Sequence, residues 1–256
     1  MRQTYLMNGD LMTVGVLLAI DCTGSMEVIH NYLAKGLSSI VTKFQEEGVP
    51  VQFSAIGFRD YPANPDTAFE VIDFNESILP LETWLSSIKA FGGGSNYGES
   101  SMSAIVNGIN SVSWPVVKRK VVALFTDDGP HVPDYNVESW DYARRFISNE
   151  DIEQIHIFTI SRKIERYDEL DGHDYVVIRH TLSENTLEDL EDQELEKSIR
   201  EFVKVSSSGN FGSSEIIVRD DDQFEINPFD IDDDDHSPVE SPITDLSTDE
   251  DFFDLE

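Results

Sequence analysis

Three groups of small oxygen-bearing side chains each follow an apolar segment of this chain. They are Asp21-Cys22-Thr23-Gly24-Ser25, Gly94-Ser95-Asn96 and Thr126-Asp127-Asp128-Gly129. Two carboxylates and two or three hydroxyls at one place would form a set of hard oxygen ligands without thiolate or imidazole. Such a set suits Mg²⁺, which prefers few carboxylates, several waters and octahedral geometry at about 2.0 to 2.1 Å. Mn²⁺ would fit nearly as well, whereas Ca²⁺ would need more and longer oxygen contacts.

Apolar runs and helical periodicity define the elements that must position these groups. The run 14–20 ends at Asp21 and the run 121–125 ends at Thr126, and both are typical of strands covered on both faces of a parallel sheet. Apolar residues spaced by three and four predict amphipathic helices between the strands. The predicted strands are 14–20, 53–58, 69–74, 121–125, 155–160 and 175–178, and the predicted helices are 26–44, 81–91, 102–112, 140–147 and 187–203.

This alternation predicts an α/β fold, a doubly wound and mostly parallel central sheet with helices on both faces. The segment 69–74 is expected to be an edge strand. Ligands of such sheets bind just beyond the carboxyl ends of the strands, so the three groups are expected to converge there. Asp21, Thr23 and Ser25 alternate along the chain, so their side chains can face one way while Cys22 faces the other.

The motif around Asp21 resembles the metal-ion-dependent adhesion site of the von Willebrand factor A domain. The D-x-[ST]-x-S element of that family matches Asp21, Thr23 and Ser25, and its third-loop Asp matches Asp127, with Asp128 as an extra residue before Gly129. The segments 57–61 and 126–131 look most like the intracellular branch with alpha-kinase-associated and tellurite-resistance-type A domains. The resemblance covers residues 12–205.

The resemblance implies a Mg²⁺ site held by Asp21, Thr23, Ser25, Ser95 and Asp127. The second-loop position falls on Ser95 or Asn96. In this interpretation the chain is a non-enzymatic interaction module, in which an Asp or Glu of a partner protein completes the metal shell. The resemblance also implies a scaffold role in a multiprotein complex, beside a kinase, a phosphatase or an AAA+ ATPase.

Other interpretations of the same residues remain open. Asp21, Thr23, Ser25 and Asp127 could cap helices or turns, and Asp128 could be a solvated or supporting acid. A second function is a Mg²⁺-dependent phosphohydrolase or phosphotransferase with Asp21 as nucleophile. Against this enzyme, the three loops have no neighbouring Lys or Arg apart from Arg59.

Charge divides the chain into unequal parts. The 256 residues carry a formal net charge of −32, and residues 206–256 contain 17 acidic side chains and one Arg, which is half of that charge. Such a segment cannot bury enough apolar surface to offset its ordering entropy. We therefore expect an N-terminal extension at 1–11, a von Willebrand factor A-like domain at 12–205 and a mostly disordered acidic tail at 206–256. Phe and Ile recur among the acids of the tail, so a third function is that the tail binds a partner or the metal site of another copy.

The same charge excludes several function classes. A surface rich in carboxylates repels nucleic acids and anionic membranes. A single cysteine, Cys22, excludes an intramolecular disulfide, and no run reaches the length of a membrane span. The N-terminus has no secretion-signal pattern. These features favour a soluble protein in the cytoplasm.

Overall fold

A six-stranded sheet forms the centre of the computed structural model, which describes residues 13–75, 77–92, 98–172, 174–187, 190 and 192–208. The strand order is β3-β2-β1-β4-β5-β6. β3 pairs antiparallel with β2, and the other pairs are parallel, which confirms the predicted doubly wound α/β fold and its edge strand. The strands are β1 (Val14–Asp21), β2 (Val51–Phe58), β3 (Phe69–Ile72), β4 (Arg119–Phe125), β5 (Gln154–Ile160) and β6 (Val176–Ser183).

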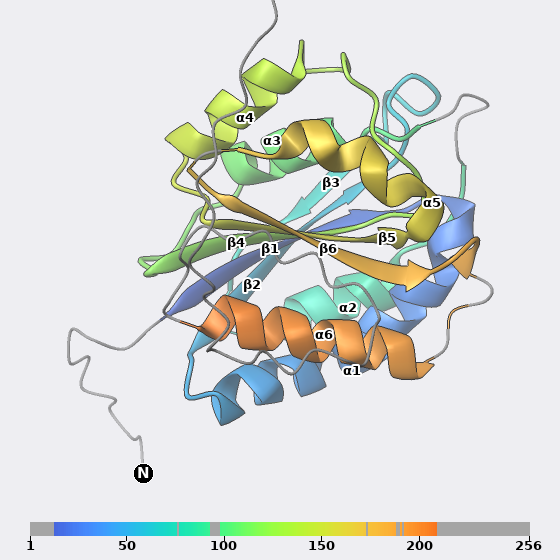
Figure 1. Ribbon diagram of the computed structural model, residues 1–256. Coiled ribbons are helices and arrows are strands. Elements are labelled where there is room, and N and C mark those ends of the chain that lie inside the picture. The colour runs from blue at the N-terminus through green and yellow to red at the C-terminus, as the bar shows by residue number, and fades with distance from the viewer. Residues whose placement is uncertain are drawn as a thin grey trace, which may run out of the picture. The chain divides into compact units, whose positions relative to one another are not determined.

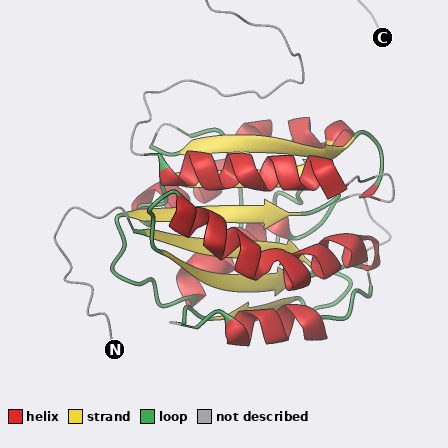
Figure 2. Ribbon diagram, turned by 90° about the horizontal axis from the view of Figure 1, so that it is seen from below, coloured by secondary structure: helices red, strands yellow, loops and turns green. Residues whose placement is uncertain are grey.

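Helices cover both faces of this sheet (Figures 1 and 2). The helices α1 (Glu27–Glu46), α2 (Leu79–Ser87) and α6 (Asp192–Ser207) lie on one face. The opposite face carries α3 (Ser101–Ser111), α4 (Trp140–Asn149), α5 (Ser161–Ile164) and the 3-10 helix η2 (Glu165–Leu170). A second 3-10 turn, η1 (Gly24–Met26), leads from β1 into α1.

Two apolar cores, one on each side of the sheet, hold the helices in place. All residues of β1 are buried because β1 lies in the middle of the sheet and is covered twice. Gly108 lets α3 approach closely, since a Cβ there would lie 2.8 Å from Ile56 Cγ2 and 2.9 Å from Leu17 Cδ2. At the start of α3, Ser100 Oγ accepts the amide of Tyr61 at 2.9 Å, which ties this end of the helix to the chain that follows β2.

Several element ends differ from the predicted ones. α2 ends at Ser87 and not near Phe91, because Ile88 has extended backbone angles (φ −56°, ψ 130°). β6 continues to Ser183, and α6 begins at Asp192 after a turn in which the Leu190 amide donates to the Leu187 carbonyl. The short helices α5 and η2 were not predicted, because their ten residues are too few to show a helical period.

α6 runs to Ser207, and the buried Ser206 belongs to it. The carbonyl of Ser206 accepts a hydrogen bond from Arg119 Nη1 at 2.9 Å. The expected N-terminal extension at 1–11 and the expected tail from 209 onward lie outside the described residues. Among the helices that are described, none is both long and apolar enough to cross a membrane.

A buried histidine pair joins β5, β6 and α6. His156 Nδ1 and His180 Nε2 are 2.9 Å apart, and Ser206 Oγ of α6 lies 3.3 Å from His156 Nε2. Burial lowers the pKa of His180 to about 3 and holds the pKa of His156 well below 6.5. Both histidines are therefore neutral in the folded protein, whereas in the unfolded chain they take up protons below pH 6.5.

Acid is therefore expected to destabilise the fold through these histidines, with the loss beginning as the pH falls below about 6.5. Between pH 7 and pH 5 the wild type should lose about 2 kcal/mol of unfolding free energy relative to His180→Phe, which keeps the ring stacked on Phe158. Urea unfolding of both proteins at both pH values measures this difference. The carboxylates are the same in the two proteins, so their contribution to the pH dependence cancels in the comparison. Parallel pH profiles of the two proteins would show that His180 does not carry the effect.

Candidate metal centre

The loops after β1 and β4 meet at the centre of the sheet. β1 and β4 are neighbours, paired in parallel up to Ile20 and Phe125. The chain builds outward from β1 to β2 on one side and from β4 to β5 and β6 on the other, so strand order reverses between them. A reversal of this kind opens a crevice at the carboxyl ends of the strands, where doubly wound sheets bind ligands. Two of the three predicted groups, at 21–25 and 126–129, therefore lie at one place.

Asp21 ties the two loops together from below. Its Oδ1 accepts the Thr23 amide at 2.9 Å and its Oδ2 accepts the Thr126 hydroxyl at 2.8 Å. The Asp21 side chain is fully buried and is not among the residues that line the pocket described next. Burial, reinforced by the nearby charge of Asp127, raises the pKa of Asp21 to about 7 despite the Thr23 amide. Asp21 thus supports the pocket and has no freely exposed oxygen.

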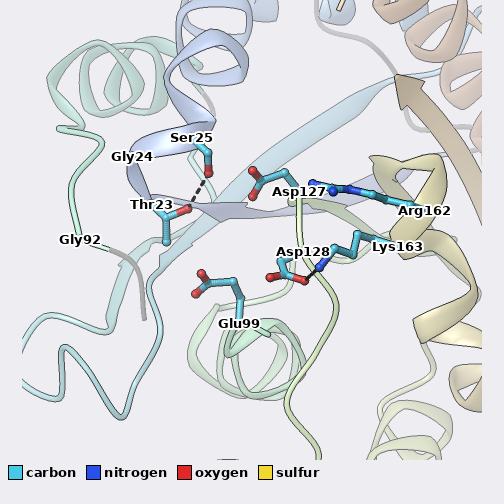
Figure 3. Close-up of a pocket in the computed structure, with 9 residues that line it drawn as sticks. All are labelled: Thr23, Gly24, Ser25, Gly92, Glu99, Asp127, Asp128, Arg162 and Lys163. Carbon is cyan, nitrogen blue, oxygen red and sulfur yellow. Dashed lines mark hydrogen bonds and ion pairs between the residues drawn. The ribbon is translucent and has the colours of Figure 1, made fainter. Parts of the chain in front are cut away.

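Thr23, Ser25 and Asp127 line an open pocket of about 280 Å³ (Figure 3). Thr23 Oγ1 and Ser25 Oγ lie 3.4 Å apart, and the Asp127 carboxylate faces the same space. The chain thus brings together two hydroxyls and a carboxylate above the buried Asp21. The residues that complete the lining are Gly24, Gly92, Glu99, Asp128, Arg162 and Lys163.

Glu99 adds a carboxylate that the sequence interpretation did not include. It is 8 % exposed, lines the pocket, and its Oε2 is buried without a hydrogen-bond partner among the described residues. Burial, with the charges of Asp21, Asp60, Asp128 and Asp127, raises the pKa of Glu99 to about 9. A buried carboxylate oxygen with no donor is costly, so this position calls for a proton or a cation.

The backbone holds Glu99 against the third loop. Its amide donates to the Gly129 carbonyl at 2.8 Å, and its carbonyl accepts the His131 amide at 2.9 Å. The sequence signal for Glu99 was an acid at the end of the glycine-rich loop, two residues before α3. Acids near helix N-termini are common, because they favour the helix dipole, and this signal is therefore weak without the fold.

Cationic side chains also stand at the third loop, which corrects the expectation that only Arg59 would be near. Lys163 forms an ion pair with Asp128 Oδ1, and Arg166 Nη1 lies 3.4 Å from the same oxygen. Although partial burial opposes ionisation of Asp128, the Lys163 contact and the Gly129 amide lower its pKa. The expectation failed because Lys163 and Arg166 are about 35 residues from the loop in sequence and arrive through β5.

Arg59 does not face the pocket. Its guanidinium donates to the carbonyls of Thr67 and Lys89 and lies 4.2 Å from the centre of the Phe91 ring. Cys22 is buried and its thiol donates to the Ile20 carbonyl at 3.4 Å, and burial raises its pKa to about 12. Both side chains thus have structural contacts that account for them.

Ser95 and Asn96, the predicted second-loop candidates, lie outside the described residues. In the described part of the chain, no group of three or more His, Cys, Asp or Glu side chains is arranged to hold a metal ion. The predicted set differs in kind from such a group, because hydroxyls make up much of it. Oxygen sets of this sort, with water in the remaining positions, are used for Mg²⁺.

No family model and no curated protein matches the chain. Solved structures do match. Proximal thread matrix protein 1 from the mussel byssus superposes with a TM-score of 0.54 at 13% identity, over 77% of this chain and 47% of that protein. The pilus adhesin SpaC from Lactobacillus rhamnosus GG gives a TM-score of 0.52 at 13% identity, over 77% of this chain and 30% of the adhesin. The chain thus spans less than half of either protein, and at this identity the likeness shows the fold alone.

Proposed function

We propose that the chain is a metal-dependent protein-interaction module. In this proposal Thr23, Ser25 and Asp127 hold Mg²⁺ in the pocket, with Asp21 behind them and Glu99 beside them. The observation that carries the proposal is that these hydroxyls and carboxylates face one open pocket at the strand-order reversal. Glu99, which also lines the pocket, has a buried oxygen with no hydrogen-bond partner in the part of the chain that the structure describes.

The electrostatics of the pocket favour a cation. Burial, together with neighbouring carboxylates, raises the pKa of Asp21 to about 7 and that of Glu99 to about 9, so their ionised forms are costly unless a positive charge is close by. A divalent cation supplies that charge and favours the ionised carboxylates over the protonated ones, so that both groups can ionise. Thr23 and Ser25 offer neutral oxygens, as a small, hard and partly hydrated ion requires. Mn²⁺ is expected to replace Mg²⁺.

A partner carboxylate fits the remaining coordination position. Ser25 is exposed and Asp127 is half-buried at the edge of this open pocket, so a bound ion would be reachable from outside. The chain has a net charge of −32 and would otherwise repel an acidic partner. The bound metal would make this pocket a binding site for an Asp or Glu side chain of the partner.

The enzymatic alternative is less well supported. Lys163 and Arg162 line the pocket and provide the cationic groups that phosphoryl transfer needs. The structure therefore offers a phosphate-binding charge that the sequence interpretation of the enzyme lacked. However, Asp21, the proposed nucleophile, is fully buried and both of its oxygens accept hydrogen bonds. A nucleophile must present an open oxygen to the substrate, and Asp21 presents none in this arrangement.

The wider setting of the module is also a proposal. We place it in the cytoplasm as a scaffold in a multiprotein complex, with a kinase, a phosphatase or an AAA+ ATPase as partner, on the resemblance of its motif. The acidic segment from 209 onward is a further candidate for binding, either to a partner or to the metal site of another copy.

Capture of a partner with and without metal tests the module directly. The immobilised chain is expected to retain a protein in Mg²⁺, release it in EDTA and retain it again in Mn²⁺, because the ion bridges the two. Ser25→Ala should lose this retention, whereas Ser39→Ala, on the exposed side of α1, should keep it. Equal retention of the partner in Mg²⁺ and in EDTA would count against the module, as would metal-dependent turnover of p-nitrophenyl phosphate.

A further inference from the structure

Arg162 is a cation of the site without a partner among the described residues. It follows the end of β5 in α5, and no hydrogen bond or ion pair joins its guanidinium to any part of the chain that the structure describes. Its neighbour Lys163 is paired with Asp128. In Figure 3 the Arg162 side chain extends toward Asp127. The Arg162 side chain is exposed, so its guanidinium is free to pair with a group that approaches the pocket from outside.

A second pocket of about 210 Å³ adjoins the first on the side of Arg162. The two pockets share Ser25, Asp127 and Arg162. The second pocket is completed by Ile160, Asn185, Thr186 and Leu187, so Asp127 is its acidic residue and its other polar side chains are neutral or cationic. Arg162 therefore stands between the metal position and a neighbouring hollow that can receive a second group.

The size of the two pockets indicates what could enter them. Each is smaller than the roughly 300 to 1,000 Å³ typical of sites for small-molecule ligands. Each suits one side chain of a protein segment lying across the surface. An extended segment places alternate side chains on the same side, about 6.5 to 7 Å apart. Two such side chains could enter neighbouring pockets.

We propose that Arg162 is the second anchor of the partner, which therefore carries two acidic residues separated by one position. This inference rests on the proposed function: one acid would complete the metal shell, and the other would pair with the Arg162 guanidinium. A guanidinium binds a carboxylate through two parallel hydrogen bonds, which gives direction as well as attraction. The recognised class is thus an acidic segment of the type Asp-x-Asp, and a single acid binds more weakly.

Two blocked peptides of identical length test the inference on the full chain in saturating Mg²⁺. One contains Asp-Ala-Asp and the other Asp-Ala-Asn, and calorimetry measures their affinities. The wild type should bind the two-acid peptide about tenfold more tightly, as expected for one charge-assisted hydrogen-bonded pair. In Arg162→Gln this advantage should disappear, while the one-acid peptide still binds and its binding still requires Mg²⁺.

Arg200→Gln is the matched control, since it removes the same charge from an exposed position on α6 that contacts Glu196. It should keep the tenfold preference. The inference is overturned if Arg162→Gln keeps the preference. It is also overturned if this variant only tightens Mg²⁺ binding, because Arg162 would then be a counter-charge to Asp127.

The same titrations separate this inference from the proposed function. If the wild type prefers the two-acid peptide equally in EDTA, and Arg162→Gln loses that preference, then the metal role fails and the Arg162 anchor stands. If neither peptide binds in Mg²⁺ or in EDTA, the anchor is overturned together with the module. Peptide binding that needs Mg²⁺ but shows no preference in the wild type overturns the anchor alone.

Discussion

Magnesium at one hundred times its dissociation constant is expected to stabilise the wild-type chain by about 2.7 kcal/mol, and the Asp127→Asn variant by nothing measurable. Asp127 is the predicted ligand whose carboxylate is open to the pocket. Its loss removes the charged contact that would draw the ion into the site. In a domain of this size the stabilisation corresponds to a rise in melting temperature of about 5 to 10 °C.

The metal-free Asp127→Asn variant is expected to fold at least as well as the wild type, because the Asp127 charge opposes ionisation of Asp21 and Glu99. Asp151→Asn is the matched control. Asp151 is exposed between α4 and β5 and has φ of 54°, which Asn tolerates. This control should keep the full response to Mg²⁺. Equal melting curves of the wild type with and without Mg²⁺ would remove the main support for a metal site.

The affinity for Mg²⁺ is expected to fall about tenfold for each pH unit below pH 9, down to about pH 7. The pKa of Glu99 is raised to about 9 in the metal-free protein, so at neutral pH a proton occupies the position that the ion requires. Binding must then release that proton. Below pH 7, Asp21 is protonated as well, and the dependence should steepen further.

Calorimetry at pH 6, 7 and 8, in buffers of different ionisation enthalpy, measures both the affinity and the number of protons released. Glu99→Gln cannot hold a titrating proton, so its Mg²⁺ affinity should be nearly independent of pH between 7 and 8. A slope in Glu99→Gln as steep as in the wild type would show that the ion does not displace a proton from Glu99.

The arrangement of strands and helices followed from the sequence because the apolar runs were long and regular. The runs that became β1 and β4 are buried on both faces, and they read as strands without ambiguity. The strand-end rule selects the groups at 21–25, 94–96 and 126–129 from the sequence. Of the five predicted ligands, Thr23, Ser25 and Asp127 line one pocket, Asp21 does not line it, and Ser95 lies outside the described residues.

Contacts between distant segments were beyond the reach of the sequence. Glu99 enters the pocket because its backbone pairs with Gly129, and Lys163 meets Asp128 across 35 residues. The spacing of residues along the chain does not predict contacts between segments that are this far apart in sequence. The position of Asp21 was also unexpected, since two hydrogen bonds to its oxygens place it beneath the pocket and not at its surface.

A crystal structure of the full chain with Mn²⁺, located by its anomalous scattering, tests the metal site most directly. We predict one strong peak in the pocket, at about 2.1 Å from the Thr23 and Ser25 hydroxyl oxygens, with Asp127 and Glu99 beside it. A map without a peak between Thr23, Ser25 and Asp127, at Mn²⁺ concentrations well above that of the protein, would contradict the proposal of a metal-dependent interaction module.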